Sequence, residues 1–305
     1  MAVQGRINGE LGSLADDGVL AALVNFGVGW VALVVLVGTR RETRAALGGI
    51  PAQLRKGALP WWTLLGGFGG ATFVVAQSTT VSALGVALFT IATVAGQTGM
   101  SLAVDRWGLG PAGVVPLTVL RIIAAVLATV AVAVAASGRG GASGSGARWF
   151  VFLALIAGAA VAFQTAFNGR VSVATGKPTV AALVNFTIGL LVLFVVLAVE
   201  RSRRATIHGS LPSVVDRPWL YAGGFLGILF VVTGAWSVRA LGVLLFSLVV
   251  IAGTLLGAVA VDLVAPTPGV TFTWALVTGV VMTFCAVALA SVRKRLPATW
   301  QDSAP

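Results

Sequence analysis

The chain has 305 residues, of which 58% are hydrophobic and only 10% are charged, and its mean hydropathy is +1.00. A soluble domain carries about a quarter charged residues, so the composition excludes a soluble globular protein and indicates a polytopic membrane protein. The net charge of +11 comes from short basic clusters beside apolar runs. Such clusters are typical of membrane topology signals, and we expect no nucleic-acid partner. With one cysteine and one histidine, neither a disulfide framework nor a metal cluster is available, and we expect no cofactor.

The first apolar run is unusually short. Only residues 1–3 precede Gln4, which is too few to span a hydrocarbon core of ~30 Å, whereas a long apolar run precedes the matching Gln164. We expect an upstream extension that completes the first helix; a partial first helix is the alternative.

Nine full-length apolar segments follow. They cover residues 19–37, 59–76, 81–104, 114–136, 149–167, 180–199, 219–238, 241–261 and 270–292. Their length and the absence of period-2 alternation predict helices rather than barrel strands. A Gly/Ser-rich stretch, residues 137–148, is typical of a flexible linker. We therefore predict a first repeat over residues 1–136, this linker, a second repeat over residues 149–292 and a polar tail over residues 293–305.

The two halves of the chain share a sequence pattern. AALVNF at residues 21–26 recurs at residues 181–186, GGF at 66–68 recurs at 223–225, and LGV at 84–86 recurs at 241–243. A register held over so many residues indicates a duplication. Because each half has five spans, an odd number, the second half enters the membrane from the opposite side. The predicted fold is therefore all-α, a polytopic membrane protein of two inverted five-helix repeats with a solute site between them.

The repeated motifs resemble the YdcZ-like branch of the drug/metabolite transporter superfamily. That branch has Gln-x-x-x-Asn-x-x-Leu, then Ala-Ala-Leu-(Val/Ile)-(Asn/Ser)-Phe-x-x-Gly and a Gly-Gly-x-x-Gly helix. Leu-Gly, Gly-Gln and Asp-x-(Phe/Trp)-Gly follow before an arginine. In this chain the first-half positions are Gln4, Asn8, Leu11, Gly29, Gly66, Gly67, Gly70, Gly96, Gln97, Asp105, Trp107, Gly108 and Arg121. The second half departs from the pattern where Thr254 replaces the glutamine and Thr278 the arginine. The resemblance implies a multi-pass transporter of the cell (inner) membrane and names no solute.

Uncharged amides inside the spans are the candidate solute-binding groups. Gln4 with Asn8, and Gln164 with Asn168, form i, i+4 pairs that share a helix face. Gln97 is the strongest candidate because it lies deep in a long span. The predicted binding residues are Gln97, Gln164, Asn168, Asn25, Asn185, Gln77, Gln4, Asn8, Trp236 and Thr254. Each amide is also open to a structural interpretation, as an interhelical hydrogen bond worth ~0.6–2 kcal/mol, and Asn168 lies near the predicted end of its helix, where it could cap it.

Arg121 is the only charge inside a predicted span, about a third of the way into it by position. We expect it to pair with Asp105, either as a gate or as a structural salt bridge. No nucleotide-binding motif or nucleophile elbow is visible, so we expect no enzyme. The predicted function is a secondary transporter that moves a small solute by alternating access. The alternative is a non-transporting scaffold or lipid-binding subunit. The expected partners are the solute and the lipid bilayer, and the oligomeric state stays open, a monomer included.

Overall fold

The computed structural model describes residues 1–137, 145–203, 211–264 and 273–291, and every regular element in these ranges is a helix. The first half contains α1 (Ala2–Ala15), α2 (Gly18–Thr39), α3 (Arg41–Gly48), α4 (Ile50–Arg55), the 3-10 helix η1 (Trp61–Leu65), α5 (Gly66–Arg106) and α6 (Val119–Ser137). The second half contains α7 (Ser145–Thr175), α8 (Pro178–Arg203), the 3-10 helix η2 (Pro218–Tyr221), α9 (Gly223–Val264) and α10 (Trp274–Ser291). The predicted all-α class is confirmed.

Both long helices are broken at a glycine. Gly85 in α5 has φ 74° and ψ 161°, and Gly242 in α9 has φ 74° and ψ 169°. Only glycine adopts this conformation without a clash of its side chain. The breaks occupy matching positions of the sequence repeat and divide α5 and α9 into two segments each. Within the described residues, the first half thus supplies five main segments, α1, α2, two from α5 and α6, and the second half supplies α7, α8, two from α9 and α10. The inverted relation of the two halves stays a prediction.

One predicted boundary between spans is wrong. We expected the polar residues 77–80 to separate two helices, but they lie within the first segment of α5. Their hydroxyl groups are satisfied inside the helix, where Thr79 Oγ1 donates to the Val75 carbonyl (2.8 Å) and Thr80 Oγ1 to the Ala76 carbonyl (2.6 Å). Because threonine can bond to its own helix in this way, a short polar run does not end a helix.

Three predicted helix ends also differ. Helix α7 continues to Thr175, so Asn168 lies two turns inside it and caps nothing. Helix α6 begins at Val119, so Arg121 stands in its first turn rather than well within a span. Helix α7 begins at Ser145, inside the stretch that we predicted as a linker. The remaining linker residues 138–144 and the tail 293–305 lie outside the described residues.

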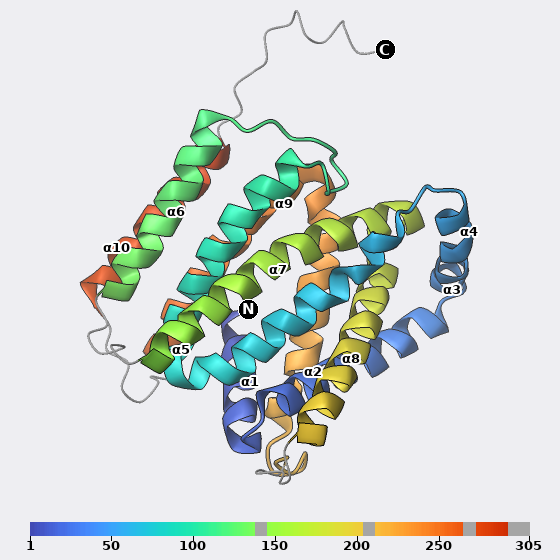
Figure 1. Ribbon diagram of the computed structural model, residues 1–305, viewed down its shortest axis with the longest axis horizontal. Coiled ribbons are helices and arrows are strands. Elements are labelled where there is room, and N and C mark those ends of the chain that lie inside the picture. The colour runs from blue at the N-terminus through green and yellow to red at the C-terminus, as the bar shows by residue number, and fades with distance from the viewer. Residues whose placement is uncertain (138–144, 204–210, 265–272, 292–305) are drawn as a thin grey trace, which may run out of the picture.

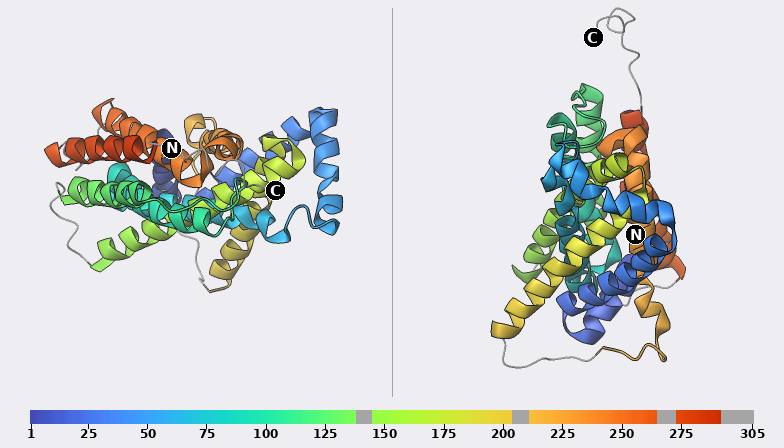
Figure 2. Two further views of the ribbon diagram at one scale, coloured as in Figure 1. Left: turned by 90° about the horizontal axis from the view of Figure 1, so that it is seen from above. Right: turned by 90° about the vertical axis from the view of Figure 1, so that its right-hand side faces the viewer.

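The helices form one bundle in which the two halves interlock. Helix α5 of the first half packs along α7 of the second, and α2 packs against α8. Helices α6 and α10 run side by side at one edge, and the short helices α3 and α4 lie at the opposite edge (Figure 1, Figure 2). Helices α5 and α7 approach each other closely because each has a glycine at the contact. A methyl group on Gly96 of α5 would lie 1.9 Å from the Leu155 carbonyl oxygen. A methyl group on Gly158 of α7 would lie 1.8 Å from the Thr93 carbonyl oxygen.

Four helical stretches in the described part of the chain are long and apolar enough to cross a membrane. They are Gly18–Thr39, Trp149–Thr175, Pro178–Ser202 and Pro218–Val243, and shorter apolar helices cover Val119–Ala131, Leu245–Gly257 and Val277–Ala286. The outward faces of these helices carry exposed large apolar side chains such as Val35, Val126 and Val195. Lipid is the solvent in which such faces are stable.

Candidate functional site

The structure gathers the predicted amide residues at the interface between the halves. In the first half, Asn25 Nδ2 donates to Asn8 Oδ1 (2.7 Å), and Asn8 Nδ2 donates to Gln77 Oε1 (2.6 Å). These bonds join α2, α1 and α5. In the second half, Asn168 Nδ2 donates to Asn185 Oδ1 (3.0 Å) and joins α7 to α8. All five side chains are buried. We call these groups the first-half and second-half amide clusters.

Each amide cluster is covered by a glycine of the opposite half. A methyl group on Gly223, at the start of α9, would lie 2.4 Å from Asn25 Nδ2 of the first half. One on Gly66, at the start of α5, would lie 2.6 Å from Asn168 Oδ1 of the second half. Because any side chain at these positions would collide with an amide, the glycines allow the backbone of one half to seal the polar groups of the other.

Two phenylalanines meet between the amide clusters. Phe26 and Phe186, which occupy matching positions in AALVNF, have ring centroids 4.8 Å apart and are tilted by 35°. A cavity of about 20 Å³ beside them, here called the central cavity, has room for about one water molecule. Its lining includes Gln4, Asn25, Gly70, Phe73, Gln164, Asn185, Gly227 and Phe230. The central cavity thus combines amides from both halves with aromatic rings.

Gln97 lies beside a second cavity of similar size, about 20 Å³, which Gln77 and Thr254 also line. Its Nε2 donates to Ser247 Oγ of α9 (3.1 Å), and Ser247 also bonds to Ser101 (3.1 Å). Gln97 therefore connects the two halves, opposite its predicted repeat partner Thr254. Its part in solute binding stays a prediction. We call this space the Gln97 cavity; it shares the wall residue Phe73 with the central cavity.

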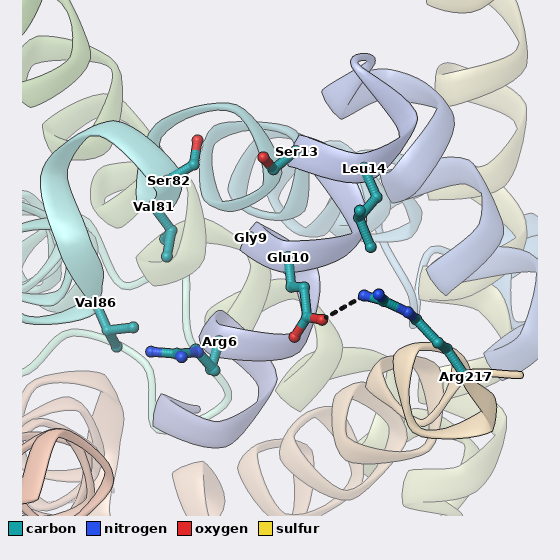
Figure 3. A pocket seen from close by; sticks show the side chains of 9 residues that line it. All are labelled: Arg6, Gly9, Glu10, Ser13, Leu14, Val81, Ser82, Val86 and Arg217. Carbon is teal, nitrogen blue, oxygen red and sulfur yellow. Dashed lines mark hydrogen bonds and ion pairs between the residues drawn. The ribbon is translucent and has the colours of Figure 1, made fainter. Parts of the chain in front are cut away.

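A larger cavity of about 390 Å³, here called the outer cavity, lies between α1, the break in α5 and the segment before η2. Figure 3 shows its charged side chains: Arg6 and Glu10 come from α1, and Arg217 approaches Glu10 from the far wall. Arg217 Nη1 lies 3.2 Å from Glu10 Oε1. Its volume is within the range of small-molecule sites. Val86 lines both the outer cavity and the Gln97 cavity, so the two are neighbours.

The opposite end of the bundle is held closed by ionic contacts. Asp105, near the end of α5, is almost fully buried; its Oδ2 lies 2.5 Å from Arg121 Nη2, and its Oδ1 accepts from the Val243 backbone N–H of α9 (3.2 Å). Asp105 follows the Gly85 break by 20 residues, which is about 30 Å of helix. The closed end and the outer cavity are therefore about one membrane thickness apart. The predicted pairing of Arg121 with Asp105 is present in the structure.

Arg170 of α7 strengthens the closed end. Its Nε donates to the Leu109 carbonyl (2.7 Å) and its Nη2 to the Gly108 carbonyl (2.6 Å). Its guanidinium carbon lies 5.5 Å from the centre of the Trp62 ring, a favourable cation–π geometry. The repeat position of Arg170 in the first half is Glu10, which lines the outer cavity. The same position of the repeat therefore lies at the closed end in the second half (Arg170) and at the outer cavity in the first half (Glu10).

Sequence reasoning did not place every residue correctly. Trp236 is 63% exposed on the surface of α9, and the structure does not bring it to the amides. Ser247 and Arg170 were not among the predicted site residues. Ser247 is a small hydroxyl in an apolar run, and nothing in its neighbours indicates the contact with Gln97. Arg170 follows the second amide motif directly, but a basic residue near the end of an apolar run is equally typical of a topology signal.

Comparison with known proteins identifies a family whose sequence model matches the chain. The sequence model of the family described as "Putative inner membrane exporter, YdcZ" matches residues 1–134 and 149–289, which is nearly the whole chain. No curated protein matches the chain significantly. The family match confirms the resemblance drawn from the repeated motifs.

Proposed function

The chain belongs to this family of inner-membrane exporters, and from that premise we propose that it is a secondary transporter that moves a small solute by alternating access between its two inverted halves. Membership and the apolar helices support a multi-pass transporter of the inner membrane. The solute and the mechanism are the parts that we propose.

The observation that carries the proposal is the difference between the two ends. At one end, the outer cavity of about 390 Å³ is open. At the other, Asp105 and Arg170 tie the halves together through Val243 and the carbonyls of residues 108 and 109. A protein built from inverted repeats can exchange these arrangements, since each half contains the counterpart of the other. The structure is then one of two access states.

The cavities also follow one another in a row. The outer cavity shares Val86 with the Gln97 cavity, which shares Phe73 with the central cavity. Each of the two inner cavities has a volume of only about 20 Å³, so a solute enters them only when the halves move apart. The contact between Phe26 and Phe186 is the apolar barrier that this movement would open.

The close packing at the centre also favours the alternative, a non-transporting scaffold. A protein that never opens has no need of a larger central space, and small residues such as Gly96 and Gly158 form a tight interface for stability alone. The two functions differ in one respect that can be measured. A transporter exchanges access between its ends, whereas a scaffold keeps one arrangement.

Cysteine labelling distinguishes the two functions. Ser82→Cys reports on the outer cavity and Ser247→Cys on the buried layer behind the closed end, each on a Cys285→Ser background. We expect Arg170→Ala to raise the labelling of Ser247→Cys and to lower that of Ser82→Cys, each by about tenfold, because it removes charge-assisted hydrogen bonds made in one state only.

The matched control is Arg217→Ala, which removes an arginine from the open end. Its pair with Glu10 is exposed, so we expect little change at either reporter. If Arg170→Ala leaves both reporters unchanged, the scaffold function is correct. A parallel rise at both reporters would indicate general loosening and would also count against alternating access.

A further inference from the structure

The two amide clusters differ in the number of amides they contain, and the second-half cluster has one buried NH2 group without a hydrogen-bond acceptor. In the first half, the chain of bonds from Asn25 through Asn8 ends on the Gln77 oxygen. The repeat position of Gln77 in the second half is Gly234, so Asn168 and Asn185 have no third amide. Among the described residues, nothing accepts a hydrogen bond from Asn185 Nδ2, although Asn185 is fully buried.

The number of spare NH2 groups in this pair does not depend on which way the two asparagines are turned. Rotating an asparagine by 180° exchanges its nitrogen and oxygen, but two amides always carry two NH2 groups. The pair makes one hydrogen bond, so one NH2 group remains without an acceptor in either arrangement. A buried donor of this kind destabilises a protein, and such groups are concentrated at functional positions.

In the amide orientation of the structure, the leftover donor belongs to Asn185 and lies at the central cavity. A methyl group on Gly70 would be 3.3 Å from Asn185 Nδ2 and also 3.3 Å from Gln164 Nε2. Two amide donors therefore converge on the space that Gly70 leaves free. An oxygen placed there would receive hydrogen bonds from both.

The matching space in the other half is different. A methyl group on Gly227 would lie 3.2 Å from Gln4 Nε2 and 3.9 Å from Asn25 Oδ1. Here a donor and an acceptor face the cavity, because Asn25 uses its own NH2 group to bond Asn8. The central cavity is thus polarised. One side offers two donors, and the other side offers an acceptor with a donor.

We propose that the solute is a small uncharged molecule with a carboxamide-type group next to an apolar or aromatic body. Its carbonyl oxygen accepts from Asn185 and Gln164 beside Gly70, and its N–H donates to Asn25 Oδ1. The apolar body lies between Phe26 and the other phenylalanine rings that line the central cavity. The proposal rests on the transport function, because the cavity admits such a molecule only when the halves separate.

The absence of charged side chains at this site disfavours an ionic solute, although Met1, with its terminal amino group, also lines the cavity. Among the described residues that line the central cavity, none has a charged side chain. Neutral amides do not compensate the loss of hydration of a buried carboxylate or ammonium group. A carbonyl paired with an N–H group matches the donors and the acceptor without adding a charge.

Four probes with one ring test this assignment on the purified full-length protein. Benzamide has the carbonyl and the N–H, acetophenone has the carbonyl alone, aniline has the N–H alone, and toluene has neither. Affinities follow from the dependence of the thermal shift on probe concentration. We expect benzamide to bind tightest and each missing group to lower the affinity by about three- to tenfold.

Variants locate the groups responsible. Asn185→Leu should lower the affinities for benzamide and acetophenone by about three- to tenfold and leave those for aniline and toluene unchanged. Because this change also removes the bond from Asn168, Gly70→Ala is the second variant. Its methyl group blocks both donors without removing any hydrogen bond. Gly227→Ala is the matched control; it should weaken benzamide and aniline but not acetophenone.

Three results would overturn the solute class: no probe binds, all four bind equally, or Gly70→Ala weakens all four equally. None of these affects the labelling experiment with Arg170→Ala. Failure of the probe series with normal exchange of access therefore rejects the carboxamide solute alone. Failure of the exchange itself rejects transport.

Discussion

Substitution of Gly96 by alanine tests how the two halves are held together. The added methyl group would lie 1.9 Å from the Leu155 carbonyl oxygen, whereas ordinary contact begins at 3.4 Å, so α5 and α7 must separate by about 1.5 Å at this point. Backbone cannot rotate away as a side chain does. Overpacking of this kind costs about 1–3 kcal/mol or more, which exceeds the gain of up to about 1 kcal/mol from the higher helix propensity of alanine.

Gly99 provides the matched control on the same helix, one turn further on. No atom of another helix lies within 4 Å of the position that a methyl group on Gly99 would occupy, so Gly99→Ala should be neutral or stabilising. Thermal unfolding of the purified variants, followed by tryptophan fluorescence in detergent, should give Gly96→Ala a melting temperature at least about 5 °C below that of Gly99→Ala. Equal melting temperatures would refute the close α5–α7 contact.

Three further predictions concern charged and exposed groups. Arg121→Ala should lower the free energy of unfolding by about 3–5 kcal/mol, because it removes the cation that faces the buried Asp105 carboxylate. The loss should be much smaller in an Asp105→Asn background, and an equal loss in both backgrounds would contradict the pair. Lys177, by a hydrogen bond and by its charge, lowers the pKa of Glu42 below 4.5. Glu42→Gln should therefore lower the melting temperature slightly above pH 4.5, and this difference should vanish as the pH falls through the lowered pKa. A difference in melting temperature that persists in acid would contradict the ion pair. The loops predicted on the side of both termini carry 12 basic residues and the opposite loops seven, which predicts cytoplasmic termini. A cysteine at Ser213 in a cysteine-free protein should then react with an impermeant maleimide in intact cells, and labelling that requires permeabilisation would reverse the topology.

The fold was predictable because its information is local and repeated. AALVNF recurs without change, and apolar length alone indicates helices in a membrane. The errors arose where backbone conformation decides. Gly85 breaks α5 at a position with no polar neighbours, whereas the polar residues 77–80 continue the helix. The two helix ends near Asn168 and Arg121 were misplaced for the same reason, since hydropathy does not register where hydrogen bonding of the backbone stops.

The site was predictable in part. Buried amides in a membrane need partners, and this argument selected Asn8, Asn25 and Gln77 as candidate residues, which the structure then joins by hydrogen bonds. It could not show which amide bonds which, because that depends on contacts between residues far apart in the sequence. The outer cavity was invisible for the same reason: Arg217 lies 207 positions from Glu10. Only the packing of α1 against the segment before η2 brings them together.

The two central phenylalanines restrict how this protein can change over time. The ring of Phe26 lies against Gly189, where a methyl group would be 2.3 Å from Phe26 Cε1, and the ring of Phe186 lies against Gly29, where the distance would be 2.2 Å. The size of each ring is therefore limited by a glycine in the other half, and less tightly by Gly70 beside Phe26 and Gly227 beside Phe186. In related sequences, position 26 should covary with position 189, and position 186 with position 29. A substitution of the phenylalanine in one half therefore requires a compensating substitution at the glycine position in the other half.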